Sequence, residues 1–257
     1  MGWGDELVAS GLARGARERG ERIAFGFGGK IRWTPQAHEI FKNNPNVAPP
    51  GSEGAKDLRW IRHCAGARLN TSGIMASRGR WRWLPFRPPP GEIFFSDEEL
   101  AFGEAHLGGF VVLEARVKPQ YPNKQWPQDR YREVAAQLQK RGLRVVQFAG
   151  AARPVDGCGD VIVTPTFRKA LALLSRASLY VGAEGGLHHG SAAVGTKAVV
   201  IFGGWPDPKS SGYDSHRNLA APDAGCGSIA PCAHCRNAMG RITVEEVVNA
   251  AMLELFP

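Results

Sequence analysis

The sequence predicts an α/β protein in which helices cover both faces of a parallel sheet, and two observations support this prediction. From residue 109 onward, short apolar segments alternate with amphipathic segments of helical periodicity. Two capping-box signatures, Ser96 with Glu99 and Thr243 with Glu246, mark the starts of helices. Strands that alternate with helices of this length favour a parallel sheet, because each helix carries the chain back to the edge where the next strand begins.

The predicted elements can be followed in order along the chain. Residues 1–28 predict a glycine-rich loop, a helix that ends at Gly20, and a short strand. This pattern is a βαβ unit without its first strand, so we expect either that this strand is absent or that the natural chain begins further upstream. Further strands are predicted at 109–117, 143–150, 178–186 and 197–204, and helices at 96–108, 126–142, 166–177, 187–195 and 242–256.

Residues 58–90, which we call the Arg/Trp insert, contain many arginines and aromatic residues and no acidic residue. The arginines are Arg59, Arg62, Arg68, Arg78, Arg80, Arg82 and Arg87, and Trp60, Trp81, Trp83 and Phe86 lie among them. The prolines at 88–90 exclude a helix or a central strand. We therefore predict an exposed loop or an edge hairpin that leads into a linker.

The length of 257 residues leaves room for one large domain or two small ones. We place a boundary near residue 106, between an N-terminal Rossmann-like half, 1–106, which carries the Arg/Trp insert, and a better-formed C-terminal half, 107–257. The hydrophobic fraction of 43% is that of a globular protein with buried cores. No apolar stretch approaches the ~20 residues that span a bilayer, which excludes a transmembrane protein.

The net charge of +8 favours anionic partners such as nucleotides, phosphorylated glycans, nucleic acid or acidic lipid head groups, and an inert basic surface is the alternative. Asp5 and Glu6 precede any apolar run, so no signal peptide is expected. We therefore expect a cytoplasmic protein with reduced cysteines, in which any membrane contact is peripheral, at the inner membrane.

The segment 181–204 carries the most informative loop. Glu184, Gly185 and Gly186 follow one predicted strand, and the next helix begins near Leu187. Ligands of open α/β sheets bind at the carboxyl ends of strands, the glycines allow close backbone approach, and a helix N-terminus attracts anions. A carboxylate can bind sugar hydroxyls, so the loop suits a nucleotide-sugar donor. A structural turn with solvated polar groups is the alternative.

Residues 109 to about 250 resemble the C-terminal domain of the ADP-heptose:lipopolysaccharide heptosyltransferases, glycosyltransferase family 9 of the GT-B group. The resemblance rests on "NKQWPQDRYREVAAQLQKRG", on "ALLSRASLYVGAEGGLHHGSAAVGTKAVVIFGGWPDP" and on "CAHCRNAMGRITVEEVVNAA", and "GWGDELVASGLA" is similar to the family's N-terminal loop. It implies a GT-B-like fold in which two small Rossmann-like domains with parallel sheets face a cleft. It also implies inverting sugar transfer from a nucleotide-diphosphate donor, with an ADP-sugar favoured, to a hydroxyl of a cell-surface glycan or lipopolysaccharide.

The resemblance also implies roles for individual residues. Lys124 would hold the donor diphosphate, Glu184 would replace the family's donor-loop aspartate, and His189 would match the family's histidine. Asp5 would be the general base. The full donor set is Arg116, Lys124, Thr166, Phe167, Glu184, Gly185, Gly186, Leu187 and His189, and Gly4, Arg80 and Arg82 would bind the acceptor.

Some alternatives to these roles stay open. Phe167 can equally be a core residue, and Asp5 can simply cap the first helix. Glu184 in place of aspartate, and Gly185 in place of threonine, allow a sugar other than heptose.

The remaining features leave further alternatives. The Arg/Trp insert can dock nucleic acid, as in a phage-type DNA-modifying glycosyltransferase, grip an anionic lipid acceptor, or simply pack as a loop. A non-catalytic nucleotide-sugar or nucleic-acid binding protein and an epimerase of the same architecture are rival functions. Catalysis is expected to need no cofactor or metal. Cys226, Cys232 and Cys235, with His234 and perhaps His216, form an incomplete metal-binding pattern, and a reduced loop is favoured.

Overall fold

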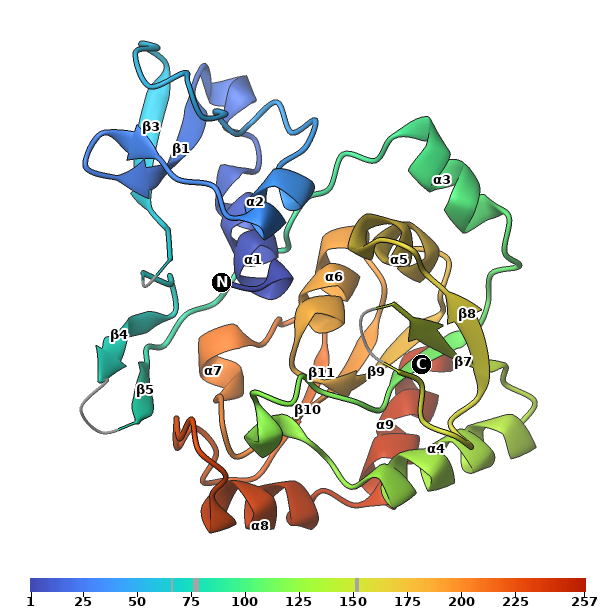
Figure 1. Cartoon of the computed structure of the whole chain (residues 1–257). Coiled ribbons are helices and arrows are strands. Elements are labelled where there is room, and N and C mark those ends of the chain that lie inside the picture. Colours follow the sequence, from blue (N-terminus) through green and yellow to red (C-terminus); the bar gives the residue numbers. More distant parts are fainter. Residues whose placement is uncertain (66, 76–78, 151–152) are drawn as a thin grey trace.

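The computed structural model describes residues 1–65, 67–75, 79–150 and 153–257, so Arg78 of the Arg/Trp insert lies outside the described residues. Its main feature is a six-stranded sheet with strand order β11-β10-β9-β6-β7-β8, in which every pair is parallel (Figure 1). The strands are β6 (Val111–Glu114), β7 (Val145–Ala149), β8 (Asp160–Val163), β9 (Leu179–Ala183), β10 (Ala198–Gly203) and β11 (Arg217–Ala220). The prediction of an α/β fold with a parallel sheet is confirmed.

Helices cover both faces of this sheet because successive strand residues point to opposite sides. Phe110 and Val112 pack on the face of α5 (Phe167–Leu174) and α6 (Gly186–Val194). Val111 and Leu113 pack on the opposite face, beneath α4 and α9. The other helices of this unit are α4 (Gln128–Lys140), α7 (Pro208–Ser211), α8 (Ala233–Arg241) and α9 (Val244–Leu255), and η3 (Pro122–Lys124) is a single 3-10 turn.

The N-terminal unit is smaller. It begins with α1 (Trp3–Ala13) and the turn η1 (Arg17–Arg19), and it contains a three-stranded sheet of order β2-β1-β3. Its strands are β1 (Arg22–Phe27), β2 (Lys30–Ile31) and β3 (Leu58–Arg62), and α2 (Pro35–Ile40) lies between the last two. β1 and β3 are parallel, so part of the Arg/Trp insert is a strand of this sheet rather than a loop, which corrects the prediction for 58–62.

Further along the Arg/Trp insert, β4 (Thr71–Met75) and β5 (Arg80–Trp83) pair as an antiparallel hairpin, which was one of the two predicted alternatives. The hairpin is attached to the C-terminal unit. The backbone N–H of Trp81 donates to Gly227 O at 2.8 Å, and the indole of Trp83 donates to Trp205 O at 2.9 Å. The polypeptide then runs past α3 (Asp97–Glu104), with the predicted Ser96 capping box, into β6.

One apolar core joins the two units. α1 packs against α6, and Leu7, Ile23 and Phe25 belong to the same buried cluster as Leu187 and Val200. Figure 1 shows α1 beside α6, with the N-terminal sheet further outward. Among the helices of the described residues, none has the length and the apolar character needed to cross a membrane.

Candidate donor pocket and cysteine cluster

A cavity of about 830 Å³ lies between α1 and the carboxyl ends of the central strands. It has the size of a pocket for a small ligand, and such pockets occur at this edge of α/β sheets. The predicted site residues that line it are Gly4, Asp5, Arg116, Lys124, Thr166, Phe167, Glu184, Gly185, Gly186, Leu187 and His189. The fold therefore brings together every predicted donor residue and two of the four predicted residues on the acceptor side.

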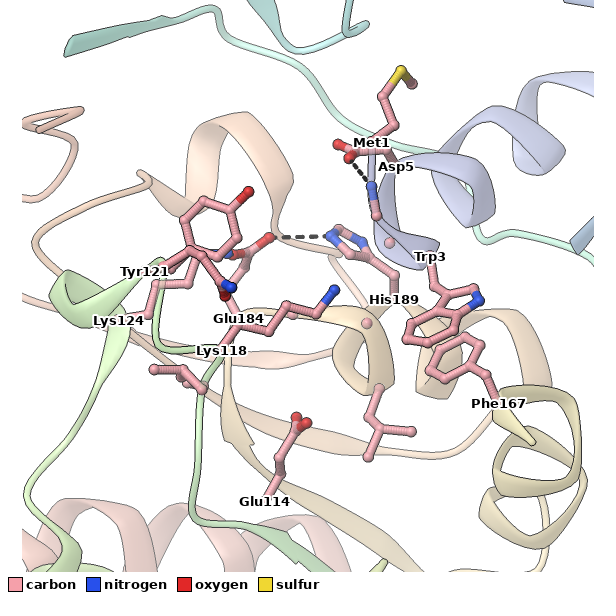
Figure 2. A pocket seen from close by; sticks show the side chains of 18 of the residues that line it. Met1, Trp3, Asp5, Glu114, Lys118, Tyr121, Lys124, Phe167, Glu184 and His189 are labelled. Carbon is pink, nitrogen blue, oxygen red and sulfur yellow. Dashed lines mark hydrogen bonds and ion pairs between the residues drawn. The ribbon is translucent and has the colours of Figure 1, made fainter. Parts of the chain in front are cut away.

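Glu184 is the centre of the polar network in this cavity. One carboxylate oxygen is paired with the Lys124 ammonium, and the other lies 3.2 Å from His189 Nε2 (Figure 2). Burial alone would raise the pKa of Glu184, but the Lys124 charge and the hydrogen bond from His189 outweigh it, so the pKa is lowered. Glu184 is therefore a fixed negative charge that orients a lysine and an imidazole.

The tautomer of His189 follows from its two partners. An ionised Glu184 can only accept, so the neutral ring carries its proton on Nε2 and donates to that carboxylate. Nδ1 then accepts from the hydroxyl of Tyr213 at 2.9 Å, and burial raises the pKa of Tyr213 so that it keeps its proton. Tyr213 thus orients His189, a role that no motif in the sequence indicates.

His188 does not line the cavity, and it is fully buried against the rings of His189, Tyr213, His216 and Phe202. Neither of its ring nitrogens has a hydrogen-bond partner among the described residues. Burial, and then the neighbouring His189 and His216, lower the pKa of His188 well below its usual value. Burial lowers the pKa of His216 to about 4. Both rings are therefore neutral packing residues near pH 7, in line with the assignment of the family histidine to His189 rather than His188.

The N-terminal helix brings Asp5 to the cavity. Gly4 is needed there, because a Cβ at this position would lie 2.5 Å from His189 Cδ2. Asp5 Oδ2 accepts the N–H of Gly2 at 2.7 Å, and Oδ1 lies 3.4 Å from Arg68 Nε. Asp5 is thus both a helix cap and a carboxylate on the side of the cavity that faces Lys124 and Glu184 (Figure 2).

Aromatic residues line the far end of the cavity. Trp3 stacks on Phe167 with 4.6 Å between ring centroids. A Cβ at Gly186 would lie 3.3 Å from the Phe167 ring, so glycine allows this ring to cover the start of α6. Phe167 is therefore exposed to the cavity rather than confined to the core, on a surface that suits a planar ring.

Sequence reasoning missed several residues of this cavity. Arg68 reaches Asp5 and also lies over Trp81, 4.3 Å from the ring centroid. The Lys124 ammonium lies over Trp205, 4.6 Å from its centroid. Glu114 ends the central strand β6 and lines the cavity. Only Glu114 had a usable signal, since a carboxylate at the carboxyl end of a buried strand is at the ligand-binding edge.

A family model described as glycosyltransferase family 9 (heptosyltransferase) matches residues 110–241, just over half of the chain. The chain belongs to glycosyltransferase family 9. The match covers Lys124, Glu184 and His189, and it ends inside α8. No curated protein matches the chain significantly.

Solved structures agree with the fold of a family 9 protein. The iron-containing dodecameric glycosyltransferase TibC from enterotoxigenic E. coli superposes with a TM-score of 0.55 at 15% identity, over 91% of this chain and 77% of TibC. ADP-heptose LPS heptosyltransferase II of E. coli (0.49, 18%) and E. coli heptosyltransferase WaaC with ADP (0.47, 20%) each match 67% of this chain. The chain spans 55% and 53% of the lengths of these two heptosyltransferases.

The two remaining acceptor-side arginines of this family 9 chain lie elsewhere. Arg80 and Arg82 are exposed and line a second groove of about 690 Å³ between the hairpin and the C-terminal unit, together with Asp207 and Lys209. Neither arginine lines the larger cavity. The hairpin supplies Arg68 and Trp83 to the larger cavity instead.

Three cysteines and a histidine converge near the C-terminal end. Cys226 Sγ lies 3.8 Å from Cys232 Sγ and 3.0 Å from Cys235 Sγ, and His234 joins the group. Sulfur atoms around tetrahedral zinc, at about 2.3 Å each, are about 3.8 Å apart. The distance between Cys226 and Cys232 matches this spacing, whereas Cys226 and Cys235 lie closer together. The predicted candidate His216 lies instead beside His188.

His234 has the environment of a metal-bound imidazole. Its Nε2 lies 3.1 Å from a carboxylate oxygen of Asp223, and its buried Nδ1 has no hydrogen-bond partner among the described residues. A ligating histidine commonly places its second nitrogen on a carboxylate. The residues of the cysteine cluster therefore fit a metal ion.

Proposed function

We propose that this chain is an inverting glycosyltransferase that transfers a sugar from an ADP-sugar, with heptose favoured, to a hydroxyl of a cell-surface glycan or lipopolysaccharide. The observation that carries the proposal is the Lys124–Glu184–His189 network at the start of α6, opposite Asp5 in one cavity. Family membership and the complex of TibC with ADP-D-β-D-heptose support the choice of nucleotide. We further propose that residues 1–106 serve the acceptor and residues 107–257 the donor.

The chemistry follows from the charges in the cavity. Asp5 accepts the proton of the acceptor hydroxyl, whose oxygen bonds to the anomeric carbon while the bond to the diphosphate breaks. The departing diphosphate gains negative charge, which Lys124 and the free N–H groups at the start of α6 stabilise. We propose that these groups make a catalytic metal unnecessary.

A nucleotide screen tests the donor site. ADP at about 100 times its dissociation constant should stabilise the protein by about 2.7 kcal/mol, which raises the Tm of a protein of this size by roughly 5–10 °C. UDP and GDP should stabilise it less. Calorimetry with ADP and ADP-heptose then gives the affinities.

Glu184→Ala provides the control for this screen, because it should weaken the ADP-sugar more than ADP. Pyrophosphate serves as the control for a general anion effect. If no nucleoside diphosphate stabilises the protein while a single-stranded oligonucleotide does, the transferase proposal is wrong and a nucleic-acid binding protein takes its place.

We also propose that Cys226, Cys232, His234 and Cys235 hold one structural metal ion, iron or zinc. Asn123, next to Lys124, donates to Ser228 O and Ala230 O and accepts from the N–H of Cys232. The cysteine cluster is thus hydrogen-bonded to the turn that presents Lys124. A bound metal would hold this loop in place, at a distance from the transfer chemistry.

Metal analysis checks this part of the proposal. The purified protein should contain about one iron or zinc per chain, and cobalt substitution should give thiolate-to-metal absorption. Cys232→Ser and His234→Ala should reduce the metal content and shift the cobalt spectrum. Cys158→Ser, whose thiol is buried elsewhere, is the matched control. Unchanged metal content in the first two variants would rule out this ligand set.

A further inference from the structure

Glu114 is a carboxyl group of the donor pocket that the proposed chemistry does not use. It is the last residue of β6, and its side chain lines the same cavity as Lys118, Lys124 and Glu184. Figure 2 shows its carboxylate directed into the cavity below Lys118. A second, half-buried carboxylate beside Glu184, at a site that attracts a diphosphate, calls for a physical explanation.

The hydroxyl of Tyr180 is the key partner of Glu114. It lies 2.5 Å from Glu114 Oε2 and 2.9 Å from the carbonyl oxygen of Ala183. Gly182 leaves room for this arrangement, since a Cβ there would lie 2.5 Å from the tyrosine oxygen. The hydroxyl has one proton, so it can donate to only one of the two acceptors at a time.

The two protonation states of Glu114 therefore give two hydrogen-bond patterns. An ionised Glu114 accepts a hydrogen bond from the Tyr180 hydroxyl, which then makes no hydrogen bond to Ala183 O. A neutral Glu114 donates a hydrogen bond from its own O–H to the Tyr180 oxygen, and the Tyr180 hydroxyl then donates a hydrogen bond to Ala183 O. Ala183 directly precedes Glu184, so the neutral state connects β6 to the donor loop through an unbroken chain of hydrogen bonds.

The groups around Glu114 nearly balance the two states. Burial raises the pKa of Glu114 to about 7, against the hydrogen bond from Tyr180 and the charges of Lys124 and Lys118, while Glu184 adds to the rise. Tyr131 of α4 is neutral at this pH, because burial raises its pKa. The positive charges of Lys124 and Lys118 favour the ionised state of Glu114. An anion bound in the cavity would offset these charges and so favour the neutral state.

We propose that Glu114 takes up a proton from solvent when a nucleoside diphosphate binds, and that it is a neutral hydrogen-bond donor in the occupied pocket. This inference rests on the proposed function, since it takes the cavity as a diphosphate site. Neutralisation removes the repulsion between Glu114 and the phosphates. It also completes the chain of hydrogen bonds from Glu114 through Tyr180 to Ala183, the residue before the loop 184–186.

The sign of the pH dependence follows from linkage. Binding raises the pKa of Glu114, so affinity is greatest below pH 7, where Glu114 is neutral before binding, and it falls as the pH rises above 7. With a pKa of about 7, part of the free protein carries an ionised Glu114 at pH 7, so binding of ADP takes up a fraction of a proton at this residue.

Titration calorimetry of ADP at pH 7.0, in two buffers of different ionisation enthalpy, measures this proton uptake. Glu114→Gln mimics the neutral state, so its affinity for ADP should lack the part of the pH dependence between pH 6 and 8 that comes from Glu114. The phosphate of ADP also titrates in this range. Glu114→Gln measures this phosphate contribution to the proton uptake, which is then subtracted from the value for the wild type. The wild type should take up more protons than Glu114→Gln, by a measurable fraction of a proton per ADP.

The outcomes separate this inference from the proposed function. If both proteins bind ADP and their proton uptake is the same, the inference is overturned and the donor site stands. If the wild type binds no nucleoside diphosphate, both fail.

Tyr180→Phe is a second variant, needed if Glu114→Gln does not fold. It removes the bond that favours the ionised state, so the maximum of proton uptake should move to higher pH. If this maximum stays in place, the inference is wrong.

Discussion

Replacing Asp5 by asparagine should lower kcat by about 10² to 10⁴, the usual contribution of a general base, while the affinity for ADP changes little. Asparagine cannot take the proton of the acceptor hydroxyl, but its amide oxygen can still accept the N–H of Gly2. The substitution therefore separates catalysis from helix capping. The measurement is ADP release from ADP-heptose with a hydroxyl acceptor, and water serves as a slow acceptor.

Glu39→Gln is the matched control for this variant. Glu39 is a second carboxylate that lines the cavity from the N-terminal unit. It accepts a hydrogen bond from the indole N–H of Trp3 rather than facing Lys124 and Glu184. Its replacement should change kcat by less than a few-fold. Equal activity of Asp5→Asn and the wild type would mean that Asp5 is only a helix cap and that another group is the general base.

Replacing Arg168 by alanine should destabilise the protein by about 3–5 kcal/mol, and so lower the Tm by roughly 10 °C. Arg168 is 3% exposed and donates two bonds to Glu99, at 2.7 and 2.8 Å. It also donates to the carbonyl oxygens of Glu39 and Phe94. The guanidinium thus joins α5 to α3 and to the N-terminal unit, and its loss leaves the buried Glu99 without its counter-charge.

Lys169→Ala is the control in the next position. Lys169 pairs with Glu98, whose side chain is 79% exposed, so its loss should cost less than about 1 kcal/mol. The double variant Arg168→Met with Glu99→Leu should recover much of the lost stability. A Tm of Arg168→Ala within 2 °C of that of Lys169→Ala would contradict this account.

The pH dependence of the Arg168 effect has a fixed sign. Burial would raise the pKa of Glu99, but the Arg168 hydrogen bonds and the backbone N–H of Ser96 lower it below its usual 4.5. The pair therefore contributes its full stability above pH 4.5 and loses it as the pH falls through the lowered pKa. Thermal unfolding of the wild type and of Arg168→Ala should show a smaller difference in Tm below pH 4 than at pH 7.

The sequence predicted best where local signals and tertiary structure agree. Helix α4 has a clear apolar stripe, and α3 and α9 have the capping boxes expected of them. The strands β8 and β11 at the two sheet edges were missed, because DVIV and RNLA are short and half exposed. Helix α8 was missed because it begins at Cys232, which offers no usual capping side chain.

Contacts between distant segments limited the prediction of the site. Lys124, Glu184 and His189 belong to motifs, so a resemblance could find them. Arg68 and Tyr213 carry no motif, and their positions depend on how the hairpin and the segment after α7 pack. Arg80 and Arg82 looked equivalent to Arg68 in the sequence, but strand pairing with Gly227 and Ser228 turns them to the other side of the hairpin.

The apolar core that α1 shares with α6 has a kinetic consequence. Swinging the two units apart would expose Leu7 and Leu187 to water and separate Gly4 from His189, so wide hinge opening is costly. A nucleotide bound at the proposed donor site would therefore enter and leave without this hinge motion, past side chains such as the Trp3–Phe167 stack. Its residence time would then depend on side chains that rearrange far faster than domains rotate.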